Sequence, residues 1–177
     1  MQRHLTRTRT AFVVILFGLL CWPMVALSEE SHTWAPYKNA RYGFSIEYPS
    51  DLFTPDEPPF NNAGRSFQSK DGKAQFSVWG SANALEQSLD EYRTGFMEVE
   101  DYSNVTYQPK GSNWFVLSGV RGDRIFYEKV ILSCRNETVN TLRVYYPTVE
   151  KARYDKIVTR LEETFRTGPG IGDEDCE

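Results

Sequence analysis

The sequence predicts an α+β fold, in which an antiparallel β-sheet of about six to seven strands is flanked by helices. Most segments of the chain read as strands, which either alternate between apolar and polar residues or form short apolar runs, and only two segments show the spacing of an amphipathic helix. The last four strand-like segments are joined by short turns, which force neighbouring strands to run antiparallel. This pattern argues against a parallel nucleotide-binding sheet.

The first half of the domain is expected to consist mostly of strands. Residues 42–48 alternate in polarity and are ended by Pro49, so they predict the first strand. Residues 49–64 are rich in proline and predict a long irregular loop. Residues 65–79 then predict a hairpin, because the dipeptide Asp71-Gly72 supplies the positive φ angles of a tight type I′ turn.

A helix is predicted at residues 85–98, with Ser88 and Glu91 as an internal capping box. Its apolar residues recur at helical spacing, namely Leu85, Leu89, Tyr92 and Phe96. Four more strands are expected to follow, at residues 105–108, 113–120, 125–133 and 138–146. Thr148 is predicted to cap a final helix at residues 149–165, which carries an apolar stripe.

The N-terminus has the features of a secretory signal peptide, predicted at residues 1–28. Three arginines precede an apolar run at residues 11–20, and Ala26-Leu27-Ser28 then provides a small-x-small cleavage site. Residues 29–36 are expected to be a flexible lead-in, residues 37–166 a single α+β domain, and residues 167–177 an acidic, glycine-rich tail.

Export to the periplasm or the exterior is the predicted localisation. The minor alternative is that the N-terminus stays anchored in the membrane, either because the signal is not cleaved or because Cys21 is lipidated. Cleavage would leave two cysteines, Cys134 and Cys176, which in an oxidising compartment are expected to form a disulfide that ties the tail to the end of a strand. No stable membrane insertion is expected after cleavage.

The charge and the histidine content exclude several classes of function. Without residues 1–28 the chain has 17 basic against 24 acidic residues, a net charge of about −7 that disfavours nucleic acid as a partner. The two histidines are His4 and His32, so the predicted domain has none for nucleophile activation or for the usual zinc ligand sets. We therefore expect no cofactor, no metal site and no enzymatic activity.

Four residues are candidates for a binding surface. Trp79, Tyr127, Arg143 and Tyr145 each lie opposite the most apolar face of their strand. If these second faces coincide, they form an aromatic surface with a cation, a composition enriched where proteins bind partners. The alternative is that the final helix covers this face, so that the aromatic residues belong to the core. Glu128 either pairs with a cation such as Arg143 on a neighbouring strand, or marks a slip in register.

The start of the domain resembles the Mog1/PsbP-like superfamily. The residues that carry the likeness are Tyr37-x-Asn39-x-Arg41-Tyr42-Gly43-Phe44-Ser45-Ile46-x-Tyr48-Pro49, together with the Asp71-Gly72 hairpin and a terminal helix after Tyr145-Tyr146-Pro147. The resemblance implies an antiparallel sheet packed between helices and a protein that binds or assists other proteins. It supplies no active-site or metal-binding residues that can be matched in this chain.

The leading hypothesis is an exported, non-catalytic accessory or scaffold protein that binds another protein of the cell envelope. The second is a small-molecule or lipid-binding module that uses an apolar cleft between sheet and helix. The third is a hydrolase that relies on carboxylates alone, which requires a pocket with two carboxylates about 5–10 Å apart.

Overall fold

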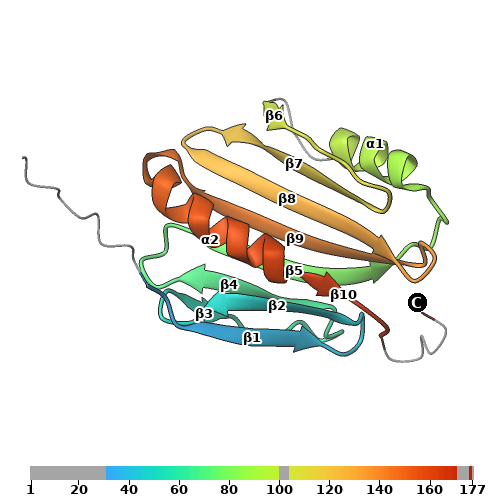
Figure 1. Ribbon diagram of the computed structural model, residues 1–177, viewed down its shortest axis with the longest axis horizontal. Coiled ribbons are helices and arrows are strands. Elements are labelled where there is room, and N and C mark those ends of the chain that lie inside the picture. Colours follow the sequence, from blue (N-terminus) through green and yellow to red (C-terminus); the bar gives the residue numbers. More distant parts are fainter. Residues whose placement is uncertain (1–30, 100–103, 171–175, 177) are drawn as a thin grey trace, which may run out of the picture. The chain divides into compact units, whose positions relative to one another are not determined.

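The computed structural model describes residues 31–99, 104–170 and 176 (Figure 1). The predicted signal peptide and most of the acidic tail lie outside the described residues. Within the described ranges, none of the helices has the length and apolar character needed to cross a membrane.

A seven-stranded antiparallel sheet forms the centre of the domain (Figure 1). Its strands follow the order β3-β4-β5-β9-β8-β7-β6. Their bounds are β3 Phe53–Pro55, β4 Gly64–Ser69, β5 Gln75–Ala82, β6 Val105–Tyr107, β7 Trp114–Arg121, β8 Arg124–Ser133 and β9 Thr138–Pro147. The structure confirms the predicted α+β class and the antiparallel pairing of the last four strands, because the short turns leave no room for a crossover.

A second, three-stranded sheet joins two segments that were expected to be irregular. In it, β2 (Phe44–Pro49) pairs with β1 (Trp34–Asn39) on one side and with β10 (Arg166–Thr167) on the other. Residues 34–36, predicted in the flexible lead-in, therefore belong to a strand, and Pro36 is tolerated because β1 lies at a sheet edge. The predicted tail likewise begins inside the sheet, since Thr167 pairs with Phe44.

The proline-rich loop and the hairpin also differ from expectation. The loop contains a short strand, β3, which pairs with β4 at the edge of the large sheet. The hairpin of β4 and β5 is present, but only Gly72 of the Asp71-Gly72 dipeptide has a positive φ, of 72°. The turn is therefore not type I′. The Asp71 carboxylate instead accepts hydrogen bonds from the Ser69 hydroxyl at 2.6 Å and the Lys73 amide at 3.1 Å.

Both helices begin later than the periodicity predicts. Helix α1 spans Leu89–Val99, and the capping box marks its start rather than its interior. The Glu91 side chain accepts a hydrogen bond from the Ser88 backbone amide at 2.8 Å. Helix α2 spans Lys151–Thr164 and follows a 3₁₀ turn, η1 (Thr148–Glu150). The Thr148 hydroxyl does not cap the helix and donates instead to the Asp123 carbonyl at 3.0 Å.

The large sheet carries an apolar cluster on each face. The inner face is defined by the residues that pack against α2 and the small sheet, among them Phe76 and Val144, which share a cluster with Leu161 of α2. The outer face is the opposite one, where Phe115 and Val130 pack against apolar residues of α1. Because α1 contributes to the cluster over β7, β8 and β9, the β4–β5 part of the outer face lies beyond this helix.

Candidate binding surface

Three of the four candidate residues share the outer face. In the strand register Arg143 lies opposite Ser77 on one side and Glu128 on the other, and Trp79 lies two residues beyond Ser77 on the same face. Tyr145 follows Arg143 by two residues on β9, so it also faces outward. The predicted coincidence of faces therefore holds for Trp79, Arg143 and Tyr145.

Arg143 links the aromatic residues of this face to a buried carboxylate. Its Nε and Nη2 atoms each lie 2.9 Å from Oε1 of Glu128. Its guanidinium carbon lies 5.3 Å from the ring centroid of Trp79 and 5.8 Å from that of Phe96 in α1. Both distances are within the range of cation–π contact. Arg143 thus stands at the border between the part of the sheet under α1 and the part beyond it.

Glu128 is a charged residue in an apolar setting, with only 1% of its surface exposed. Its carboxylate pairs with Arg143, which shows that the pairing alternative is correct and that the strand register does not slip at this point. A buried ion pair of this kind is costly to break, because removal of one partner takes away a charge that offsets the other in a low-dielectric environment. Arg143 therefore stabilises the fold by pairing with Glu128, in addition to contacting the aromatic residues of the outer face.

Tyr145 belongs partly to the core. It packs at the margin of the outer apolar cluster, and the guanidinium carbon of Arg124 lies 5.8 Å from its ring centroid. The alternative that the final helix covers the aromatic residues holds for Tyr127 but is wrong for Trp79 and Tyr145, since α2 packs on the inner face. The helix that reaches Tyr145 and Arg143 is α1.

A hollow of about 550 Å³ lies beside Trp79 and Arg143. Its other walls are residues of the proline-rich loop and of strands β4 and β5: Asp56, Glu57, Pro59, Asn61, Ala63, Gly64, Arg65, Ser66, Ser77 and Val78. A volume of this size is typical of pockets that hold a small molecule or the side chains of a partner. We name Trp79, Arg143 and the loop residues 56–63 the Trp79 surface.

The loop of the Trp79 surface is held by hydrogen bonds. The Asn39 side-chain amide donates to the Asn62 carbonyl at 2.9 Å, the Asn62 amide donates to the Pro59 carbonyl at 2.8 Å, and the Gly80 amide donates to the Ala63 carbonyl at 2.8 Å. Phe60, between two residues that line the hollow, is fully exposed to solvent. Phe60 is not among the residues that the alternation of the strands singles out, because it lies in a loop. The available signal was a large aromatic residue inside a loop of prolines, asparagines and acids.

Tyr127 lies on the inner face, apart from the other three candidates. It pairs with Val144, whereas Arg143 pairs with Glu128, so the two side chains project from opposite faces of the sheet. Tyr127 is 7% exposed and lines a cleft of about 480 Å³ beside α2. It is not part of the Trp79 surface.

Burial also changes the acidity of the inner-face tyrosines. The pKa of Tyr127 is raised, mainly because its side chain is buried and secondly because the Glu162 carboxylate lies nearby. Burial first, and the hydrogen bond to Asp155 second, raise the pKa of Tyr146. A group whose pKa is higher in the folded state than in the unfolded state stabilises the fold at pH values below its unfolded pKa. This stabilisation is lost as the pH rises above that value.

The free energy of unfolding is therefore expected to fall as the pH rises above about 10, by up to about 1.4 kcal/mol per pH unit for each of these tyrosines. Denaturant unfolding between pH 9 and 11 measures this slope. We expect the double variant Tyr127→Phe/Tyr146→Phe to flatten it, with Tyr107→Phe, which removes an exposed hydroxyl, as the control. A slope that is identical in all three proteins would contradict the assignment.

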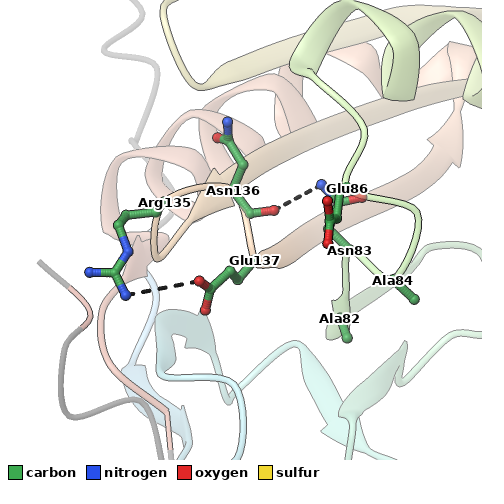
Figure 2. A pocket seen from close by; sticks show the side chains of 7 residues that line it. All are labelled: Ala82, Asn83, Ala84, Glu86, Arg135, Asn136 and Glu137. Atoms are coloured by element: carbon green, nitrogen blue, oxygen red, sulfur yellow. Dashed lines mark hydrogen bonds and ion pairs between the residues drawn. The ribbon is translucent and has the colours of Figure 1, made fainter.

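A third hollow, of about 460 Å³, surrounds the turn between β8 and β9 (Figure 2). Its polar groups satisfy one another: the Asn83 amide nitrogen donates to the Asn136 carbonyl at 2.8 Å, and Arg135 contacts Glu137 at 3.9 Å. The turn is strained, because Cys134, Arg135 and Asn136 all have positive φ angles. The Asn83 side chain is committed to holding this turn, and Arg135 and Glu137 are exposed to solvent, so we do not assign a ligand to the hollow.

The same turn is tied to the C-terminal tail. A disulfide joins Cys134 to Cys176, 42 residues further along the chain. This is the bond expected from the two cysteines that would remain after cleavage of the signal peptide. Cys134 is buried at the end of β8, so the bond fixes the tail to the strained turn. This covalent contact and the Asn83 hydrogen bonds hold the turn from two sides.

The residues that the structure describes do not assemble a metal site, since they contain no group of three or more His, Cys, Asp or Glu side chains in suitable positions. His32 contacts Asp51, with 2.8 Å between Nδ1 and Oδ2, at the start of the small sheet. The Trp79 surface combines aromatic rings, a cation, carboxylates and amides beside an open hollow. This composition is typical of surfaces through which proteins bind other proteins.

No family model and no curated protein matches the sequence. Solved structures do match the fold. The solution structure of cyanobacterial PsbP (CyanoP) from Synechocystis sp. PCC 6803 superimposes with a TM-score of 0.58 at 12% identity, covering 79% of this chain and 95% of that one. The protein has the Mog1/PsbP-like fold. The Ran-binding protein Mog1p of Saccharomyces cerevisiae superimposes with a TM-score of 0.50 at 10% identity, covering 77% and 96% of the two chains.

The Mog1/PsbP-like fold agrees with the resemblance seen in the sequence. At this level of identity the comparison establishes the architecture of the domain. Function has to be argued from the surfaces of this chain.

Proposed function

We propose that the protein is an exported, non-catalytic accessory protein that binds another protein of the cell envelope through the Trp79 surface. The observation that carries this proposal is Phe60, a fully exposed aromatic side chain on a hydrogen-bonded loop beside a hollow. A large apolar side chain that is held in solvent loses no further backbone freedom on binding, and it gains the burial of its whole ring.

Trp79 and Arg143 supply the second part of the contact. Tryptophan and arginine are the residues most enriched among those that dominate binding energy, and here they contact each other at the wall of the hollow. The hollow also presents Asp56, Glu57 and Arg65, which suit the polar rim of an interface. The expected partner places an apolar pocket over Phe60 and polar groups along the β4–β5 strands.

Two other features support the proposal. The predicted signal peptide and the disulfide are those of a protein that folds outside the cytoplasm, where an envelope partner would be found. The negative charge expected after cleavage disfavours nucleic acid. One of the proteins that share the fold is named a Ran-binding protein, an example of this architecture in a binding role.

The substitution Phe60→Asp is expected to abolish partner capture and to leave the thermal midpoint unchanged, because the ring of Phe60 is already fully in solvent. The measurement is crosslinking of the tagged mature protein in its native envelope, followed by identification of the captured proteins. Thermal unfolding of the purified variant is run alongside.

Val149→Asp is the matched control. Val149 is 91% exposed, and it lies in η1 before α2, away from the residues that line the hollow. We expect this variant to capture the same partner as the unmodified protein. If Phe60→Asp captures that partner equally well, the Trp79 surface is not the binding site.

A further inference from the structure

A second site lies on the inner face of the sheet, where α2 borders strands β6, β7 and β8. It is a cleft of about 480 Å³, and its lining residues come from both the strands and the helix. We name it the Tyr127 cleft. Pockets for small ligands commonly start at about 300 Å³, so the space is sufficient for a compact organic molecule.

Among the polar groups that line this cleft, the Tyr127 hydroxyl has the poorest hydrogen bonding. Its side chain is more than nine-tenths buried, and its hydroxyl has no hydrogen-bond partner of normal geometry among the described residues. A buried hydroxyl without a partner destabilises the fold, typically by about 1–3 kcal/mol. A ligand group that hydrogen-bonds to this hydroxyl would remove the penalty on binding.

Two carboxylates of α2 line the same cleft. Asp155 and Glu162 are seven residues apart, which is close to two helical turns, so both face the strands. Asp155 accepts a hydrogen bond from the Tyr146 hydroxyl at 2.9 Å and pairs with Lys151. Glu162 pairs with Lys129 at 3.0 Å. Each carboxylate thus already contacts one lysine, Asp155 with Lys151 and Glu162 with Lys129, and of these two lysines only Lys151 lines the cleft.

The walls of the cleft include three aromatic rings. Tyr107 is 57% exposed on β6, whereas Tyr127 and Tyr146 are buried on β8 and β9. Aromatic rings beside carboxylates form the type of environment in which organic ammonium groups are recognised. An anionic ligand would meet only Lys151, which is already paired with Asp155.

We propose that the Tyr127 cleft binds a small organic amine in its protonated form, with the ammonium group hydrogen-bonded to the Tyr127 hydroxyl and Glu162 and the apolar body against the tyrosine rings. This function does not depend on the Trp79 surface, because the two sites lie on opposite faces of the sheet. Either one can fail without the other.

The test uses three probes of the same size and different charge. Phenethylamine, 2-phenylethanol and phenylacetate are titrated into the purified mature protein, and binding is followed by calorimetry and by NMR shifts of α2. We expect saturable binding of the amine, with shifts at Val158 and Thr159, and at least tenfold weaker binding of the alcohol and the acid. Equal binding of all three probes, shifts elsewhere, or no saturable binding of the amine would each overturn the proposal.

Two variants distinguish a binding role from a structural one. Tyr127→Phe is expected to weaken amine binding at least tenfold while leaving the protein about equally stable, since the hydroxyl it removes lies near Glu162 but makes no hydrogen bond of normal geometry. Glu162→Gln is expected to weaken binding to a similar extent. Its control is Glu163→Gln, which removes the same charge from the exposed side of α2. Amine binding that is unchanged in Tyr127→Phe and Glu162→Gln would show that the cleft is not the site.

Discussion

Replacement of Arg143 by methionine is expected to lower the free energy of unfolding by about 3–5 kcal/mol. The reason is that Glu128, with 1% of its surface exposed, would keep its charge in the apolar outer face without the guanidinium that contacts it at 2.9 Å. Equilibrium denaturation in urea near neutral pH measures the effect.

The double variant Glu128→Leu/Arg143→Met is expected to recover most of this loss, because an apolar pair of similar size avoids the buried charge altogether. Lys110→Met is the control, because it removes one partner of an ion pair that is exposed to solvent. Lys110 and Asp90 are only 2.7 Å apart, but both side chains are more than half exposed, so we expect a loss below about 1 kcal/mol. A double variant as unstable as the single one would show that the pair is not the source of the effect.

The same ion pair links the stability of the fold to the Trp79 surface. Because Arg143 holds a buried carboxylate, its removal would disturb folding and binding together. Phe60 makes the cleaner test, since its side chain is fully exposed.

Removal of the disulfide is expected to lower the free energy of unfolding by up to about 4 kcal/mol, the chain-entropy value for a closed loop of this length. The bond joins residues 42 positions apart, so its loss frees a long segment of the unfolded chain. The measurement is denaturant unfolding with and without a reductant, on protein produced in an oxidising compartment.

The double variant Cys134→Ala/Cys176→Ala provides the control. Its stability should match that of the reduced protein and should not respond to the reductant. Two free thiols in the oxidised preparation, detected by mass spectrometry after alkylation, would contradict the disulfide and weaken the argument for export.

The sequence was a reliable guide wherever structure depends on near neighbours. Strands β7, β8 and β9 follow from strand-like segments separated by short turns, which fix antiparallel pairing locally. The two helices follow from apolar spacing. Their starting points do not, because Ser88 turned out to be the cap of α1, and Thr148 bonds to Asp123 rather than to its own helix.

The candidate surface shows the limit of alternation. Alternation states which residues share a face within one strand, but it does not state which faces of neighbouring strands coincide. Trp79 and Arg143 were grouped correctly, whereas Tyr127 was grouped with them and lies on the other face. The register that sets Glu128 opposite Arg143 decides this, and that register comes from the packing of the whole sheet.

The sequence by itself determined the α+β class and the order of most elements, and it favoured a disulfide between the two cysteines, because these depend on local periodicity and composition. Only the tertiary structure decided that residues 34–36 and 166–167 form strands beside β2, that Phe60 is exposed, and that Tyr127 faces α2. Each of these depends on contacts between residues far apart in the chain, which no local pattern specifies.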